Sequence, residues 1–321
     1  MPSRVFDMKS TADQVLEGTD LTGKLALVTG ASSGLGVETA RALAAKGARV
    51  VMAARDVAKI EQQAAAIRAK HPNAQLEVMQ LHLDQPASVR AFAKAFLAKH
   101  PKLNLLIGNA GVMACPLERT AEGWEMQFAT NHLGHFLLGN LLAPALIAGA
   151  PSRLISVSSA GHQFSPVVFD DIHFEKRPYD KWASYGQAKT ANILFAVEFD
   201  RRFSGKGVRA FANHPGGIRT ELGRHLTAED IAFIQQRAAQ RSSNTGGMAW
   251  KTPEQGAATQ VWGATAPELA GKGGLYLEDA RISGPNPPPG SAGCAPYALD
   301  AENAKKLWAV SEQMLGESFP G

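Results

Sequence analysis

Tyr185 and Lys189 stand four residues apart in the stretch YGQAK, and these residue types at this spacing could carry acid–base chemistry. In a helix, residues i and i+4 share one face, so the phenol and the ammonium would be neighbours. A nearby ammonium favours the phenolate and lowers the tyrosine pKa from about 10 toward the working pH, as general acid–base catalysis requires. Taken alone the pair is a weak signal, and the default interpretation is a tyrosine that packs at the core edge beside a solvated lysine. Other parts of the chain must decide between a catalytic and a structural role for the pair.

A second candidate site is the glycine-rich stretch VTGASSGLG, which starts at Val28. An apolar run precedes it and a helical pattern follows, so it would connect a strand to a helix. A helix N-terminus offers unpaired N–H groups and a positive dipole end, which suit a phosphate. On this interpretation Gly30 makes the turn, Gly34 contacts a pyrophosphate and Gly36 lets the helix pack on the sheet. The alternative is a glycine-rich turn that binds no ligand.

Short apolar runs alternate with helical patterns along the chain. Strands are expected at 25–29, 49–54, 76–83, 103–108, 154–157, 208–212 and 274–277, and helices at 35–46, 57–70, 86–99, 123–147, 182–203 and 254–264. This alternation indicates βαβ units and a parallel sheet. Right-handed crossovers then predict an α/β fold with a doubly wound parallel sheet of the Rossmann type.

The pattern contains no linker that would divide the chain. Residues 1–20 are interpreted as an N-terminal extension and residues 21–321 as a single dinucleotide-binding domain. The partly helical segment 221–252 follows the sixth strand, so it is a possible cover for a substrate. The Pro/Gly-rich segment 283–293 is interpreted as a surface excursion.

Composition excludes several classes of protein. Of the 321 residues, 45% are hydrophobic and 19% charged, which is typical of a globular chain, and the net charge of +4 comes from scattered basic residues rather than a nucleic-acid-binding face. Cys115 and Cys294 are far apart and lack metal-ligand spacing, which favours free thiols in a reducing compartment. Without a signal peptide or a long apolar stretch, a cytoplasmic protein with no membrane or nucleic-acid partner is expected.

Five motifs occur in one order and identify a family resemblance over about residues 20–280. They are TGASSGLG at 29–36, NAG at 109–111 with Gly108 before it, Asn131 in TNHLG, Ser159 followed by the Tyr185–Lys189 pair, and PGGIRT at 215–220. Together they resemble the short-chain dehydrogenase/reductase family, in which the second motif reads NNAG and an asparagine stands where this chain has Gly108. The resemblance implies a cofactor-binding set of Thr29, Gly30, Ser32, Ser33, Gly34, Leu35, Gly36, Arg55, Asn109, Ala110, Gly111, Tyr185, Lys189, Pro215, Gly216, Ile218 and Thr220.

The cofactor implied is NADP, with NAD possible. NAD-binding members usually carry an acid at the end of the second strand, where this chain has Ala54 followed by Arg55. A guanidinium can bind a 2′-phosphate, which a carboxylate would repel. An ordinary surface arginine is the alternative. Family members often have an aspartate against the adenine, and either His82 or Asp84 stands near that place.

The resemblance also implies the catalytic roles, and these need no metal. Ser159 would bind the substrate oxygen, with Ser158 as the other candidate, and Tyr185 would donate or accept the proton. Lys189 would lower the Tyr185 pKa and bind the nicotinamide ribose. Asn131 would kink its helix and support the proton path through a water.

The neighbouring residues His132 and His135 are expected to be structural.

A long segment lies between Ser159 and Tyr185, and it looks like that of the retinol-dehydrogenase-like branch of the family. This branch tends to act on hydrophobic alcohols and carbonyls. Since no membrane anchor is recognised in this sequence, its soluble bacterial-type members are the better analogy. The segment's apolar residues 164 and 167–169 would line a pocket or pack the segment itself.

The expected function is hydride transfer between NADP(H) and an alcohol or carbonyl carbon of a small hydrophobic molecule. The alternatives are an NAD-dependent alcohol dehydrogenase and a catalytically silent nucleotide-sensing protein, although sensors often lose the tyrosine. A homodimer or homotetramer is possible, since relatives commonly pair through their two long helices.

Overall fold

A computed structural model of the protein describes residues 5–241, 250–285 and 292–319. Within them one sheet runs through the molecule, in the strand order β3-β2-β1-β4-β5-β6-β7-β8, and every pairing is parallel except β7 with β8. The strands are β1 (Leu25–Thr29), β2 (Arg49–Ala54), β3 (Gln75–Gln80), β4 (Leu105–Gly108), β5 (Ser152–Val157), β6 (Val208–His214), β7 (Leu275–Glu278) and β8 (Arg281–Ile282). The predicted doubly wound α/β fold is confirmed.

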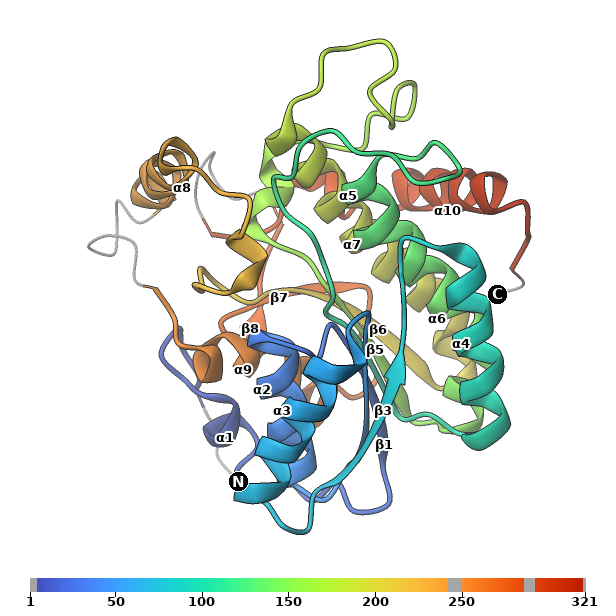
Figure 1. The fold of residues 1–321 in the computed structure, drawn as a ribbon, viewed down its shortest axis with the longest axis vertical. Helices are drawn as coiled ribbons and strands as arrows, with labels where there is room; N and C mark the ends of the chain where they lie inside the picture. Colours follow the sequence, from blue (N-terminus) through green and yellow to red (C-terminus); the bar gives the residue numbers. More distant parts are fainter. Residues whose placement is uncertain (1–4, 242–249, 286–291, 320–321) are drawn as a thin grey trace.

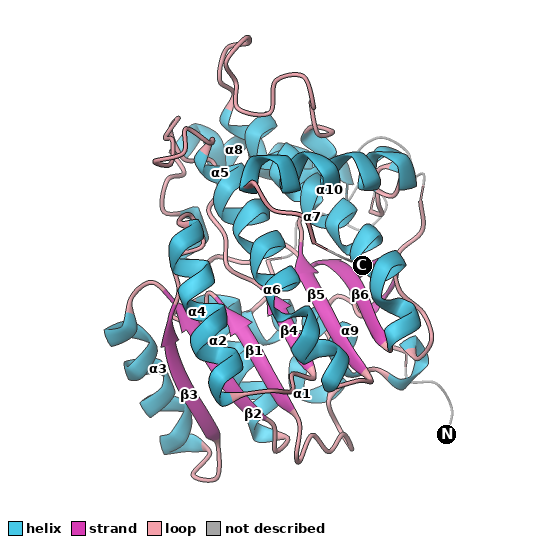
Figure 2. Cartoon of the chain, turned by 90° about the vertical axis from the view of Figure 1, so that its right-hand side faces the viewer, coloured by secondary structure: helices cyan, strands magenta, loops and turns pink. Residues whose placement is uncertain are grey.

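Helices cover both faces of the sheet (Figures 1 and 2). One face carries α1 (Ala12–Val15), α2 (Gly34–Ala45), α3 (Val57–Lys70) and α9 (Pro253–Thr265). The other face carries α4 (Pro86–Lys99), α6 (Gly134–Ala148), α7 (Lys181–Phe203) and α10 (Ala301–Leu315). The remaining α-helices are α5 (Met126–Phe128) and α8 (Ala228–Arg241).

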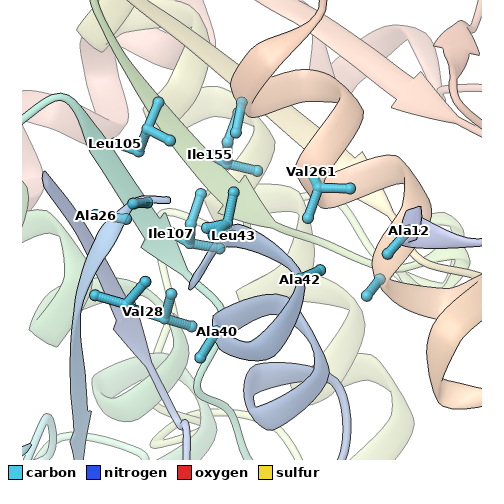
Figure 3. Packing of buried hydrophobic residues seen from close by; sticks show 14 of the residues in the cluster. Ala12, Ala26, Val28, Ala40, Ala42, Leu43, Leu105, Ile107, Ile155 and Val261 are labelled. Atoms are coloured by element: carbon cyan, nitrogen blue, oxygen red, sulfur yellow. The ribbon is translucent and has the colours of Figure 1, made fainter. Parts of the chain in front are cut away.

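Each face buries its own apolar core because side chains on successive strand residues point to opposite sides. Figure 3 shows one core, where Val28 and Ile107 of the sheet pack against Leu43 of α2 and Val261 of α9. These side chains are fully buried or nearly so. The small residues of α2 let that helix approach the sheet closely, which brings its N-terminus to the carboxyl ends of the strands.

The predicted strands and helices agree with the structure apart from a few boundaries. The third strand was expected to reach residue 83 but ends at Gln80, and Leu81 and Leu83 instead bury their side chains in the core beyond the strand. The helix expected at 123–147 starts at Met126, because the Glu125 carboxylate accepts the N–H groups of Gln127 and Phe128. A π-helical turn, η1 (Ala129–Leu133), joins α5 to α6.

Two terminal helices are absent from the sequence expectations. Thr11 caps α1 in a capping box with Gln14, and Ala12 and Leu16 are fully buried, so the N-terminal segment packs onto the domain rather than extending from it. At the other end, α10 covers α6 and α7.

Trp308 fixes α10 in place. Its ring lies 4.8 Å from the ring of Phe136 and 6.3 Å from that of Phe195, and its side chain is fully buried. We expect Trp308→Ala to lower the free energy of unfolding by about 3–5 kcal/mol, because a large cavity opens between three helices. Denaturant unfolding measures this. Lys305→Ala on the exposed face of the same helix should change the value by less than about 0.5 kcal/mol, and equal losses in both variants would contradict the account.

Candidate active site

A cavity of about 1810 Å³ opens at the carboxyl ends of the strands, where loops after β1, β2, β4, β5 and β6 meet. In a doubly wound sheet this edge, near the change in strand order, is where ligands bind. Nearly all the predicted cofactor residues line this one cavity. The exception is Gly36, which lies beneath the glycine turn rather than at the cavity surface.

The glycine turn forms a bare backbone cradle. Gly30 and Gly34 have positive φ values of 67° and 55°, a region that side chains strain. A Cβ on Gly36 would lie 2.3 Å from the Gly30 oxygen, so only glycine allows α2 to start there. Ser33, the N-cap of α2, makes no side-chain capping bond, which leaves the first N–H groups of α2 without a side-chain cap beside the cavity. These features fit a dinucleotide pyrophosphate.

Thr29 joins the first strand to the NAG segment. Its Oγ1 accepts the N–H groups of Asn109 and Ala110, both at 3.0 Å, and the Asn109 side chain donates to the Thr29 oxygen at 2.9 Å. The Asn109 amide therefore braces the cradle instead of pointing freely into the cavity.

His135 is part of the same network. Its Nδ1 lies 3.0 Å from the Asn131 oxygen and its Nε2 lies 2.9 Å from Thr29 Oγ1. Burial lowers the pKa of His135 to about 4, so the ring is neutral. Nδ1–H must then donate to the carbonyl, and Nε2 accepts the Thr29 hydroxyl proton. The His135 ring explains why a glycine, Gly108, stands where the family's NNAG has its first asparagine: a Cβ at this position would lie 3.1 Å from the ring.

The end of β2 carries a positive charge into the cavity. Arg55 and Lys59 both line it, whereas the Asp56 carboxylate accepts the Lys59 N–H as the N-cap of α3. His82 and Asp84 lie in the same wall. Of these two, Asp84 carries a buried carboxylate oxygen, Oδ1, with no hydrogen-bond partner among the described residues.

Ser159 and Tyr185 face each other at the cavity wall. Ser159 is the N-cap of the 3-10 turn η2 (Ala160–Phe164), and its Oγ accepts the Gly161 N–H at 3.0 Å. The Ser159 hydroxyl lowers the pKa of the Tyr185 phenol, against the larger rise caused by burial. Tyr185 packs directly on Gly161, where a Cβ would lie 2.7 Å from Cε1 of the ring. Ser158 is used differently, because its hydroxyl donates to the Lys189 oxygen at 2.7 Å.

Lys189 is buried beside Tyr185. Its Nζ donates to the Val157 oxygen at 3.0 Å and lies 5.7 Å from the centroid of the Tyr185 ring. Burial lowers the pKa of Lys189 to about 7 and raises the pKa of Tyr185 to about 12. The expected lowering of the Tyr185 pKa is thus not a property of the protein alone, since desolvation outweighs the lowering effect of Ser159.

Asn131 lies in the π-helical turn, close to Lys189. Its amide spans the backbone of Val112, accepting the N–H at 2.8 Å and donating to the oxygen at 2.9 Å. A Cβ on Gly111 would lie 2.9 Å from Asn131 Oδ1 and 3.6 Å from Lys189 Nζ, so both side chains lie close to this glycine. The helix distortion expected at Asn131 is present, but its side chain does not line the cavity.

His132 lies on the other side of this turn and bonds Ser311 of α10 at 2.8 Å. Burial lowers the pKa of His132 to about 3, so it is neutral and joins two helices.

Within the described residues no three His, Cys, Asp or Glu side chains are grouped to hold a metal ion. Cys115 and Cys294 are both buried as free thiols.

The part of the cavity beyond Tyr185 has aromatic walls. Phe164, Trp182 and Phe233 form a ring cluster with centroids 5.4–5.7 Å apart. Phe164 and Trp182 line the cavity. The other three apolar insert residues do not line the cavity, and two of them, Val167 and Phe169, pack into a separate core together with side chains of α7 and α10. Trp182 was missed by the sequence reasoning, although its position three residues before Tyr185 puts it on the same helix face.

No helix among the described residues combines the length and the apolar character needed to cross a bilayer. The segment interpreted as a substrate cover is described at 221–241 and 250–252, and the rest of it lies outside the described residues. Its described part includes α8, from which Ile231, Ile234 and Arg237 line the cavity.

A family model described as short chain dehydrogenase matches residues 24–231. The chain is 42% identical to short-chain dehydrogenase/reductase prx1 of Penicillium roqueforti, over 97% of this chain and 92% of that protein. It is 40% identical to retinol dehydrogenase 13 of Homo sapiens, over 94% of this chain and 87% of that protein.

Among solved structures, the crystal structure of a protein from Mycobacterium paratuberculosis matches with a TM-score of 0.74 and 33% identity, covering 98% of this chain and all of that one. The strand order, the glycine cradle and the Ser159–Tyr185–Lys189 group agree with these similarities. The chain therefore belongs to the short-chain dehydrogenase family and is an oxidoreductase that uses a nicotinamide cofactor.

Proposed function

We propose that the protein transfers a hydride between NADP(H) and the alcohol or carbonyl carbon of a hydrophobic small molecule. The observation that carries this proposal is the convergence of Ser159, Tyr185 and Lys189 on the cavity that also contains the glycine cradle. The aromatic walls formed by Phe164 and Trp182 favour an apolar substrate body.

The chain's own residues would bind the cofactor and move the proton. The cradle of Gly30–Gly36 would hold the pyrophosphate and Lys189 the nicotinamide ribose. When bound, the nicotinamide supplies or accepts the hydride. Tyr185 would give its phenolic proton to the carbonyl oxygen in reduction and take it back in oxidation. Ser159 would orient that oxygen by hydrogen bonding to it.

The preference for NADP is attributed to Arg55. The guanidinium lies in the cavity wall, and the neighbouring Asp56 carboxylate is engaged as a helix cap. A charged hydrogen bond to a phosphate is worth about 1.5–3 kcal/mol.

Asp84, with its unpartnered buried oxygen, is proposed to accept a hydrogen bond from the adenine amino group. The segment 221–252 is proposed to cover the substrate.

Arg55→Ala should lower kcat/KM for NADPH by about 10- to 100-fold and leave kcat/KM for NADH within about threefold. Steady-state kinetics with both cofactors measures this. Arg49→Ala, at the opposite end of β2, is the matched control and should change neither value. An unchanged NADPH preference in Arg55→Ala, or a natural preference for NADH, would overturn the assignment in favour of an NAD-dependent alcohol dehydrogenase.

A panel of aldehydes and ketones tests the proposed activity itself. NADPH consumption in the presence of hydrophobic carbonyl compounds is the expected result, together with a fluorescence change on NADPH binding. Binding without consumption across the panel would favour the nucleotide-sensing alternative.

A further inference from the structure

The peptide unit between Ser159 and Ala160 is held on both of its polar atoms by histidine rings. The Ser159 oxygen lies 2.7 Å from Nδ1 of His162. The Ala160 N–H donates to Nδ1 of His214 at 3.1 Å. His162 comes from the turn that follows Ser159, whereas His214 is the last residue of β6, so two separate elements grip one peptide.

Backbone donors fix the tautomer of each ring. The Ala295 N–H donates to His162 Nε2 at 2.9 Å, so that nitrogen carries the lone pair and Nδ1–H donates to the Ser159 oxygen. In His214 the nitrogen that accepts the Ala160 N–H is Nδ1, so the proton is on Nε2, which faces Glu278 Oε1 at 4.0 Å. Both rings therefore act in their neutral form.

The far sides of both rings lead to one segment near the C-terminus, residues 293–297. His162 reaches it directly through Ala295, and His214 reaches it through Glu278, whose Oε2 accepts the Gly293 N–H at 2.9 Å. Gly293 lies at the end of the segment interpreted from sequence as a surface excursion, and its 286–291 part is outside the described residues. Gly293, Cys294 and Ala295 are buried, and Ala295 lines the cavity.

This arrangement controls the direction of the Ser159 hydroxyl. Ser159 lies beyond the end of β5, so the sheet ladder does not hold its carbonyl, which accepts the His162 ring at 2.7 Å and the His162 backbone N–H at 3.1 Å. Rotation of the Ser159–Ala160 peptide would break the Oγ bond to the Gly161 N–H and move the hydroxyl away from Tyr185. A displacement of about 1 Å in a positioning group can cost about 100-fold in rate.

We propose that His162 and His214 are positioning residues that clamp the Ser159–Ala160 peptide and so hold the Ser159 hydroxyl toward Tyr185. The inference rests on the proposed function, in which Ser159 orients the substrate oxygen. It also makes segment 293–297 a structural support of the active site.

Matched substitutions at His214 test the clamp. His214→Leu removes the acceptor and should lower kcat about 10- to 100-fold, with KM and the Kd for NADPH within about threefold. His214→Asn keeps an oxygen at the position of Nδ1 and should retain kcat within about threefold. His100→Asn, a buried histidine outside the cavity wall, is the control for a general loss of stability and should keep kcat.

The same design at His162 covers the case in which His214→Leu does not fold. His162→Asn keeps a donor at the δ position and should retain more kcat than His162→Leu by about tenfold. Equal kcat in the Leu and Asn variants at both positions, after correction for the folded fraction, would overturn the clamp.

A double-mutant series separates this inference from the proposed function. In a Ser159→Ala background, His214→Leu should cause no further loss of kcat, because its effect acts through Ser159. A further loss as large as in the unmodified protein would show a general structural effect and reject the clamp. Full activity in Ser159→Ala alone would instead reject the role proposed for Ser159.

Discussion

Tyr185→Phe should lower kcat by about 1,000-fold while the Kd for NADPH stays within about threefold. The substitution removes only the phenolic oxygen, which is the group proposed to exchange a proton with the substrate oxygen, and general acid–base catalysis contributes about 10²–10⁴-fold. The ring contact with Gly161 is kept, so the cavity wall keeps its shape. Single-turnover kinetics and NADPH fluorescence titration measure the two quantities separately.

Tyr179→Phe is the matched control for this prediction. Its hydroxyl donates to the Cys115 oxygen at 3.0 Å and the residue does not line the cavity, so its loss should cost about 1 kcal/mol of stability and leave kcat unchanged. Near-normal turnover in Tyr185→Phe would remove the central assignment. A loss of NADPH binding as large as the loss of kcat would make Tyr185 a cofactor-binding residue instead.

Local patterns were sufficient to predict most of the fold. The strands at 25–29 and 49–54 and the helices at 57–70 and 86–99 match the structure to the residue. Each has an unbroken apolar or helical pattern, and boundary residues help, such as Gly47 before the strand at 49–54 and Pro86 at the first position of its helix. The C-terminal helix α10 was missed. Its pattern is helical, but the partner surface that stabilises it, on α6 and α7, is known only from the structure.

The candidate site was predicted as far as the family motifs reach. What the sequence could not indicate is the network of histidines around it, because their partners lie far away in the chain. His135 bonds Thr29 across 106 positions, and His162 meets Ala295 across 133. Gly108 read as an unexplained departure from the NNAG pattern until the His135 ring was found in the space beside it.

Burial reverses one electrostatic expectation and leads to a prediction about stability. Spacing alone places a charged Lys189 beside Tyr185, but the Nζ is removed from water and the pKa falls from 10.5 to about 7. The unfolded chain therefore binds this proton between pH 7 and 10.5, where the folded protein has released it. The free energy of unfolding must therefore rise with pH through that window. Below pH 7 Lys189 is charged in both states, and the folded protein bears the full cost of burying the cation.

Lys189→Met should consequently have opposite effects on stability and activity. Below pH 7 the variant should be more stable than the unmodified protein by a few kcal/mol, because an apolar side chain of similar length replaces a buried cation. The advantage should shrink by about 2 kcal/mol between pH 7 and pH 9 as the native lysine loses its proton. Denaturant unfolding at the two pH values measures this, with Lys94→Met, on the exposed side of α4, as the control that should show neither effect.

The same variant should lose about 100- to 1,000-fold in kcat, with a shifted pH–rate profile, because the remaining phenol has no ammonium to favour its ionised form. A variant that is less stable at every pH would show that the Lys189 ammonium is well compensated by partners such as the Val157 oxygen. A variant that is more stable and fully active would show that the buried charge has no part in catalysis. Only the combination of gained stability and lost turnover fits a cation kept in an unfavourable place for the reaction.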